Sequence, residues 1–147
     1  MPPEKFRLAL IQMSATPDPD QNLCQAMERV RQAAAQSAQV VCLPELFQTQ
    51  YFCQREDPSL FDLAEPIPGP ASKRLSQLAR ELHVVLIASL FEKRAPGVYH
   101  NTAAVFDSDG TLRGLYRKMR RAGTRRRRHV GPLRNQGYEL KEGGNRG

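Results

Sequence analysis

The 147-residue chain has no tryptophan, only three cysteines and no long apolar run. No segment approaches the ~18 uncharged apolar residues of a membrane-spanning helix, so we expect no membrane interaction. No basic segment followed by an apolar one precedes the first strand pattern, so no secretory signal is predicted. Cys24, Cys42 and Cys53 are odd in number, and none has histidine or cysteine at metal-ligand spacing. We therefore expect free thiols in a cytoplasmic protein without a metal site.

Acidic residues are scarce at the end of the chain. Residues 1–118 carry 13 basic and 13 acidic side chains, whereas residues 119–147 carry nine and two. The formal charge of +7 therefore lies entirely in the second segment, which contains four consecutive arginines at 125–128 and no cysteine. We expect residues 1–119 to form a folded region and residues 120–147 to be an irregular, disordered, arginine- and glycine-rich tail.

The basic tail allows a second interpretation of the chain. Arg125–Arg128 would attract phosphates, and such binding would weaken with salt. However, no helical periodicity organises these arginines, Tyr138 is the one aromatic residue of the tail, and no nucleic-acid-binding module is recognisable. We therefore expect no specific nucleic-acid partner. A non-catalytic binding protein with a basic tail, or a subunit of a hetero-oligomer, stays open as an alternative function.

The first 118 residues alternate between strand and helix patterns. Apolar stripes predict one helix that follows Asp18 and contains Leu23 and Ala34, and a second that contains Leu75 and Leu82. Residues 47–70 lack periodicity and predict a long loop near a site. Apolar runs predict strands at residues 6–13, 39–43, 84–90, 100–106 and 111–116, of which the second is expected to be covered on both faces.

A hairpin turn is predicted at residues 107–110, where Gly110 can adopt a positive φ. The order of elements predicts an α/β fold, in which a mixed sheet carries helices on one face.

Glu45 and Lys118 are the first candidates for a functional site. Glu45 directly follows a predicted buried strand, and functional groups of α/β sheets gather beyond the carboxyl ends of strands. Pro44 restricts the backbone before it. Lys118 follows the last predicted strand. Taken alone, Glu45 is more simply a helix cap or an ion-pair partner, and Lys118 a solvated charge.

Longer strings give these two residues a context. Residues 8–12, 42–47, 99–103 and 116–119 occur in the order and at the intervals of the nitrilase, or carbon–nitrogen hydrolase, superfamily. Residues 45–54, 61–70 and 85–94 further resemble its N-carbamoylputrescine amidohydrolase branch. The resemblance covers residues 6–119 and implies that they form the N-terminal half of a four-layer αββα sandwich.

The resemblance also implies an activity. The family hydrolyses linear carbon–nitrogen bonds other than peptides, so the expected substrate is a small carbamoyl amine or amide. N-Carbamoylputrescine, cleaved to putrescine in polyamine biosynthesis, is the expected example. The full-length family is expected to form homo-oligomers and to need neither a metal nor an organic cofactor.

A Glu–Lys–Cys triad is implied by the same resemblance. Glu45 matches the general base and Lys118 matches the triad lysine. The family's cysteine thiolate attacks the substrate carbon after losing its proton to the base, and the lysine stabilises the oxyanion. That cysteine lies well beyond the lysine, where this chain has none. Neither Cys42 nor Cys53 is expected to replace it, so we expect this chain to be inactive.

The composition changes abruptly after Met119. Residues 120–147 contain eight arginines and six glycines, and their strings do not resemble the family. A GC-rich coding sequence read in a shifted frame encodes such a composition. An alternative splice or a gene-model error would have the same appearance.

Overall fold

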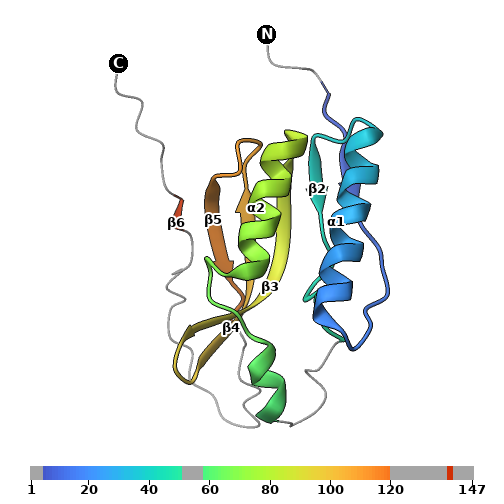
Figure 1. Ribbon diagram of the computed structural model, residues 1–147. Coiled ribbons are helices and arrows are strands. Elements are labelled where there is room, and N and C mark those ends of the chain that lie inside the picture. Colours follow the sequence, from blue (N-terminus) through green and yellow to red (C-terminus); the bar gives the residue numbers. More distant parts are fainter. Residues whose placement is uncertain (1–4, 51–57, 120–138, 141–147) are drawn as a thin grey trace, which may run out of the picture.

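The computed structural model describes residues 5–50 and 58–119 and the backbone of residues 139–140 (Figure 1). The strands are β1 (Leu8–Leu10), β2 (Val40–Cys42), β3 (Val85–Ala95), β4 (Val98–Phe106), β5 (Leu112–Arg117) and the two-residue β6 (Glu139–Leu140). The helices are α1 (Pro19–Ala35), α2 (Pro70–Leu82) and the short 3₁₀ helix η1 (Pro58–Leu63).

The strands form one mixed sheet in which spatial order follows chain order. Strands β1, β2 and β3 run parallel, whereas β3, β4, β5 and β6 pair antiparallel with one another in turn. Parallel neighbours require crossover connections, which α1 and α2 provide. Both helices lie on the same face of the sheet (Figure 1). The predicted mixed α/β sheet with helices on one face is therefore confirmed.

Local sequence explains where α1 begins and which face it buries. The Asp18 carboxylate accepts hydrogen bonds from the backbone N–H groups of Asp20 and Gln21, which satisfies donors that a helix start leaves unpaired. Leu23 and Val30, one stripe of the predicted helix, are buried. The stripe predicted for α2 is confirmed in the same way, since Leu75 and Leu78 are fully buried.

The hydrophobic core lies between the two helices and one face of the sheet. Alternate residues of each central strand enter this core because successive strand side chains point to opposite faces. The sheet contributes mainly Val41, Leu86, Ala88, Leu90, Ala104 and Phe106.

Neither α1 nor α2 packs on the other face of the sheet (Figure 1). We define the open face as Leu8, Leu10, Val40, Cys42, Ile87, Val105 and Tyr116, which alternate with core residues along their strands. Leu10 is 72% exposed and Tyr116 is 45% exposed. The expectation that residues 39–43 are covered on both faces is wrong, because both helices pack against Val41 and its neighbours and leave Val40 and Cys42 partly exposed.

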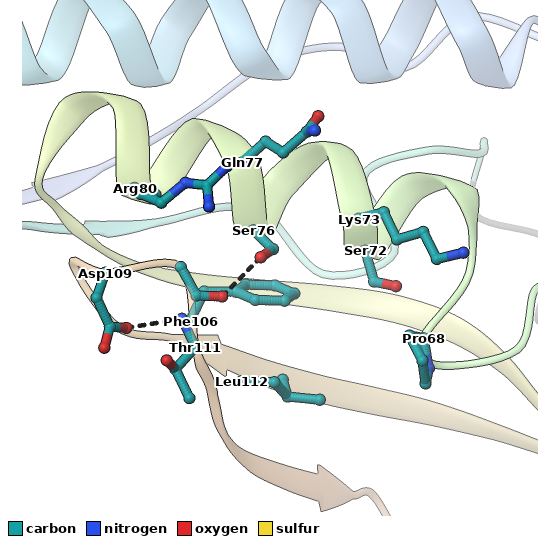
Figure 2. Close-up of a pocket in the computed structure, with 11 residues that line it drawn as sticks. Pro68, Ser72, Lys73, Ser76, Gln77, Arg80, Phe106, Asp109, Thr111 and Leu112 are labelled. Carbon is teal, nitrogen blue, oxygen red and sulfur yellow. Dashed lines mark hydrogen bonds between the residues drawn. The ribbon is translucent and has the colours of Figure 1, made fainter.

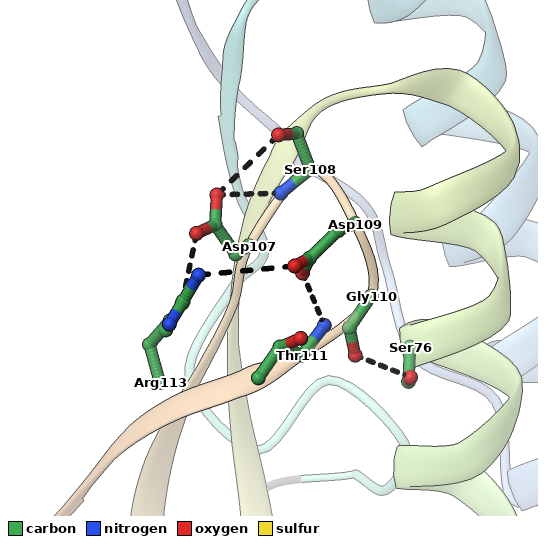
Figure 3. Close-up of polar contacts among 7 residues, drawn as sticks. All are labelled: Ser76, Asp107, Ser108, Asp109, Gly110, Thr111 and Arg113. Carbon is green, nitrogen blue, oxygen red and sulfur yellow. Dashed lines mark hydrogen bonds and ion pairs between the residues drawn. The ribbon is translucent and has the colours of Figure 1, made fainter. Parts of the chain in front are cut away.

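The turn between β4 and β5 packs against α2. A cavity of about 440 Å³ lies between that helix and the hairpin and is lined by Ser72, Ser76, Thr111 and Leu112 among others (Figure 2). Gly110 has φ +84°, which confirms the prediction for this position. Asp107 and Asp109 both pair with Arg113 across the turn (Figure 3).

Several predictions fall partly or wholly outside the described residues. These include Cys53 and most of the predicted tail. Within the tail, residues 139–140 are not irregular, because they pair with Gly114 and Leu115 of β5. None of the helices described here is long and apolar enough to cross a membrane.

Candidate active site

Glu45 and Lys118 come together although 73 residues separate them in the chain. Glu45 lies in the turn that follows β2, beyond the carboxyl end of that strand, and Lys118 directly follows β5. The Lys118 Nζ atom lies 2.6 Å from Glu45 Oε1. The two side chains are 48% and 57% exposed, so a ligand can reach the pair. The structure thus brings the two predicted site residues into contact, and their catalytic roles remain predictions.

Asn101 of β4 contacts both members of the pair. Its side-chain amide Nδ2 donates a hydrogen bond to Glu45 Oε1 at 2.6 Å. Its main-chain carbonyl oxygen accepts a hydrogen bond from the Lys118 backbone N–H at 2.8 Å. Residue 101 lies in one of the strings that resemble the family, but the sequence alone predicts no role for it. The register of two strands distant in sequence creates these contacts, and periodicity does not reveal it.

Ser89 of β3 extends this arrangement to the turn that carries Glu45. The Ser89 hydroxyl donates to Asn101 Oδ1 at 2.9 Å and accepts from the Leu46 backbone N–H at 3.1 Å. Leu46 has φ +49°, a left-handed conformation that is unusual for a residue with a side chain. Ser89 and Asn101 therefore connect the turn after β2 with two neighbouring strands.

The charges of the site favour an ionised Glu45. The hydrogen bond from Lys118 holds the pKa of the Glu45 carboxyl below its usual value, and the hydrogen bond from Asn101 acts in the same direction. Partial burial opposes both effects, and the positive charge of Lys118 adds to the lowering. Glu45 is therefore a carboxylate at neutral pH, which is the form that can accept a proton.

A second cavity adjoins Glu45. It measures about 320 Å³, and its lining includes Met13, Pro44, Glu45, Phe47 and Thr49. Glu45 is one of its lining residues, so a molecule bound in this cavity would lie beside the carboxylate. The larger cavity of Figure 2 is lined by neither Glu45 nor Lys118 and lies on the helix side of the sheet.

The loop beside this cavity is held by a buried asparagine. The Asn22 side-chain amide donates to the carbonyl oxygens of Thr16 and Gln48, both at 2.8 Å. Asn22 is fully buried, so these bonds satisfy a group whose burial would otherwise be unfavourable. The helix α1 thus fixes the turn that follows Glu45, a link that its apolar stripe did not predict.

A second ion pair lies on the helix side of the same strands. The Glu92 carboxylate receives two hydrogen bonds from the Arg117 guanidinium, at 2.7 and 2.8 Å, and one from the Thr102 hydroxyl at 2.6 Å. Glu92 is only 2% exposed. Its burial raises the pKa of this carboxyl, but the hydrogen bonds from Arg117 and Thr102 outweigh that effect and lower it. The sequence alone did not predict this pair.

The cysteines occupy other positions. Cys42 lies on the open face, and its Sγ atom lies 3.7 Å from the carbonyl oxygen of Leu43. Cys24 is exposed on α1, where the Arg74 guanidinium contacts it. Cys53 lies outside the described residues. The expectation that neither Cys42 nor Cys53 serves as a nucleophile therefore stays a prediction. Within the described ranges, no three His, Cys, Asp or Glu side chains gather into a potential metal site.

Comparison with known proteins identifies the family. The family model described as "Carbon-nitrogen hydrolase" matches residues 7–144. This chain belongs to the carbon–nitrogen hydrolase family. The superfamily expected from the sequence is thereby confirmed. The matched range extends past residue 119, where the sequence resemblance was expected to end, so the domain boundary at that residue stays a prediction.

The relatives of this carbon–nitrogen hydrolase are named as two different enzymes. It is 41% identical over 119 residues to an N-carbamoylputrescine amidase of Solanum lycopersicum, covering 78% of this chain and 39% of the relative. It is 39% identical over 115 residues to the omega-amidase NIT2 of Xenopus tropicalis, covering 78% of this chain and 40% of the relative. The chain thus spans about two fifths of the length of these relatives.

Solved structures agree with the fold. A carbon–nitrogen hydrolase from Helicobacter pylori G27 is 39% identical and superimposes with a TM-score of 0.74, covering 78% of this chain and 40% of that one. A mutant amidase from Nesterenkonia sp. AN1, in which acrylamide has added to the active site cysteine, is 29% identical with a TM-score of 0.64, covering 82% and 46%.

Proposed function

We propose that this chain supplies the general base and the lysine of an amidohydrolase site for non-peptide linear amides. The observation that carries the proposal is the contact of 2.6 Å between Lys118 Nζ and Glu45 Oε1. It brings together a carboxylate that follows β2 and an ammonium group that follows β5, beside a cavity of about 320 Å³. Both groups are exposed enough to meet a substrate.

The chemistry needs a third group, a cysteine thiol. A free thiol has a pKa of about 8.5, so at neutral pH a base must remove its proton before attack. Glu45 takes this proton while the sulfur bonds to the amide or carbamoyl carbon. Lys118 stabilises the negative charge that develops on the former carbonyl oxygen. When the intermediate collapses, Glu45 returns its proton to the leaving nitrogen, which departs as ammonia. The acyl group stays bound to sulfur. Water, deprotonated by Glu45, then releases that group.

We propose N-carbamoylputrescine as the substrate. Expulsion of ammonia from the carbamoyl group and hydrolysis of the sulfur-bound intermediate would give a carbamate, which decomposes to putrescine and carbon dioxide. The strings at residues 45–54, 61–70 and 85–94 support this choice. An ω-amide is the competing substrate, because relatives with that name are almost equally similar to this chain.

The 147-residue chain alone is proposed to be inactive. No cysteine follows Lys118 in it, so the nucleophile that the mechanism needs has no place after the lysine. Loss of the nucleophile from a group of residues that act as a unit costs on the order of 10⁶ in rate. The purified chain should therefore release no measurable ammonia from N-carbamoylputrescine. Hydrolysis that disappears in Cys53→Ser would overturn this part of the proposal.

The decisive experiment starts from the gene. Its nucleotide sequence beyond the codon of Met119 is read in all three frames, and any frame that continues the family pattern is joined to residues 1–119. The extended protein should hydrolyse N-carbamoylputrescine, with a higher kcat/KM than for an ω-amide. The reverse ranking would reassign the substrate. No hydrolysis of either compound would favour a binding protein or a hetero-oligomer subunit instead.

Variants of the extended protein test the assigned roles. Glu45→Gln and Lys118→Ala should abolish turnover. Glu28→Gln and Lys73→Ala are the matched controls, because both residues are exposed on helices outside the site. These controls should retain full activity. Equal losses in site and control variants would show that the effects come from the fold and not from chemistry.

A further inference from the structure

We propose that Asn101 is a positioning residue that holds Glu45 and Lys118 together, and that Ser89 fixes the orientation of the Asn101 amide. The proposal rests on the proposed function only for its catalytic consequence. The contacts themselves concern the folded chain, whether or not it turns over a substrate.

Asn101 touches both members of the pair from one point of the sheet. Its backbone carbonyl fixes the Lys118 backbone at 2.8 Å, and its side chain fixes Glu45 Oε1 at 2.6 Å. Strand β4 lies between β3 and β5, so its backbone is hydrogen-bonded on both sides. A group held on such a strand is more precisely placed than a group held on a loop. Loss of the Asn101 side chain would therefore release the carboxylate but leave the strand pairing intact.

Ser89 determines which end of the amide faces Glu45. A primary amide can rotate by half a turn and present its oxygen where its nitrogen was, which would place two acceptors against each other. The Ser89 hydroxyl has one hydrogen, which it donates to Asn101 Oδ1. The nitrogen of the amide is thereby directed at the carboxylate. Ser89 in turn accepts the Leu46 N–H, so the hydrogen bonds run in one direction from Leu46 to Glu45.

The left-handed conformation of Leu46 belongs to the same arrangement. A residue with a side chain loses about 1–2 kcal/mol in this conformation. At Leu46 the buried side chain, 3% exposed, and the hydrogen bond to Ser89 offset this cost. Since Leu46 directly follows Glu45, the conformation helps to determine how the turn presents the carboxylate.

These contacts distinguish the two oxygens of Glu45. Oε1 accepts hydrogen bonds from both Lys118 and Asn101, whereas Oε2 accepts none from the part of the chain that the structure describes. The geometry assigns Oε2 as the atom that receives the proton. If the Asn101 amide rotated, or if its donor were lost, the Glu45 carboxylate could rotate and its two oxygens could exchange places.

The test measures the titration of Glu45 in the 147-residue chain. The protein is labelled with ¹³C at the glutamate carboxyl carbons, and the Glu45 resonance is assigned by its disappearance in Glu45→Gln. The midpoint is then compared among the wild type, Asn101→Ala, Ser89→Ala and Ser89→Thr, with Ser108→Ala in the distant hairpin as control. Removal of a donor that favours the ionised form should raise the pKa of Glu45 in Asn101→Ala.

The two Ser89 variants distinguish the effect of the hydroxyl group on the orientation of the Asn101 amide from the effect of side-chain size. Ser89→Ala should also raise the pKa of Glu45, and Ser89→Thr should restore the wild-type midpoint because it keeps the hydroxyl. Ser108→Ala should leave the midpoint unchanged. Unchanged midpoints in Asn101→Ala and Ser89→Ala would overturn the proposal, even if both variants were less stable. If Asn101→Ala does not fold, the comparison of Ser89→Ala with Ser89→Thr decides. None of these readings needs turnover, so failure here is distinct from a missing hydrolase activity.

Discussion

Arg117 and Lys118 are consecutive residues that form ion pairs on opposite sides of the sheet. Arg117 Nη2 lies 2.7 Å from Glu92 on the helix side, and Lys118 Nζ lies 2.6 Å from Glu45 beyond the ends of β2 and β5. Successive side chains of an extended segment point to opposite sides, so the end of β5 contributes one residue to each of the two ion pairs. Glu92 is 2% exposed on its side chain whereas Glu45 is 48% exposed. The first pair therefore belongs to the core, and the second is open to a ligand.

The buried pair should be important for stability. Arg117→Met leaves the Glu92 carboxylate buried without its charge partner, which should lower the free energy of unfolding by about 3 kcal/mol. Arg113→Met is the matched control, because its pair with Asp107 is more exposed, and it should change stability by no more than about 1 kcal/mol. Urea unfolding followed by circular dichroism measures both. Equal effects of the two substitutions would contradict the role assigned to Arg117.

The same pair predicts a dependence on pH. The pKa of Glu92 is lowered in the folded chain from an ordinary value of 4.5, because its hydrogen bonds outweigh its burial. A carboxyl whose pKa is lowered on folding stabilises the fold above its unfolded pKa, and this contribution disappears as the pH falls through the folded pKa. In Arg117→Met the burial of Glu92 is less opposed, so protonation of this carboxyl at low pH relieves the variant. The difference in stability between wild type and Arg117→Met should therefore shrink as the pH falls from neutral towards 4.5 and below.

The pKa values of Asp107, Asp109 and Glu45 are also lowered. Because these residues are present in both proteins, their contributions cancel when the stability of Arg117→Met is subtracted from that of the wild type. The measurement is urea unfolding of both proteins at several pH values. Glu92→Gln supplies the control, since an uncharged amide at this position should make the difference between Arg117 and Met independent of pH in this range. A constant difference between wild type and Arg117→Met would contradict the prediction.

Much of the fold is predictable because the sequence patterns are local. The stripes of α1 and α2, the strong strand at residues 84–90 and the turn at Gly110 each follow from neighbouring residues alone. The extension of β3 to Ala95 is not predictable in this way, since residues 92–95 are mostly polar and exposed. Strand β1 is shorter than the apolar run at residues 6–13, because its neighbour β2 pairs with only three of these residues.

Some residues of the site were likewise predictable from the sequence and others were not. Glu45 and Lys118 were identified through the family resemblance, and the structure places them in contact. Glu92 was not identified, because it lies beyond the strand predicted at residues 84–90 and a charged residue normally faces solvent. Only the distant Arg117 makes its burial favourable. Ser89 and Asn101 were missed for a similar reason. Their hydrogen bonds depend on the register of β3, β4 and the turn after β2, which single-strand patterns do not contain.

A single methyl group added at Gly110 of the hairpin turn should lower the stability of the fold strongly. Gly110 has φ +84°, and a Cβ atom there would lie 2.7 Å from the carbonyl oxygen of Ser76. Gly97 has a similar φ of +76°, but a Cβ atom there would have no neighbour within 4 Å. Gly97→Ala should therefore cost about 1 kcal/mol for its conformation alone, whereas Gly110→Ala should cost clearly more. Thermal and urea unfolding of both variants measure the difference. Equal losses would mean that the hairpin can move away from α2 without cost.

The open face predicts self-association of the 147-residue chain. Leu8, Leu10 and Tyr116 are 51%, 72% and 45% exposed on one side of the sheet, and contiguous exposed apolar groups mark sites of association or aggregation. Sedimentation and binding of a hydrophobic dye should both detect this. The double variant Leu10→Lys/Tyr116→Lys should be less associated and bind less dye. Gln32→Lys combined with Gln77→Lys adds the same charge at exposed residues of α1 and α2, on the other side of the sheet, so it should have a smaller effect. If both pairs of substitutions reduce association equally, net charge and not the open face controls it.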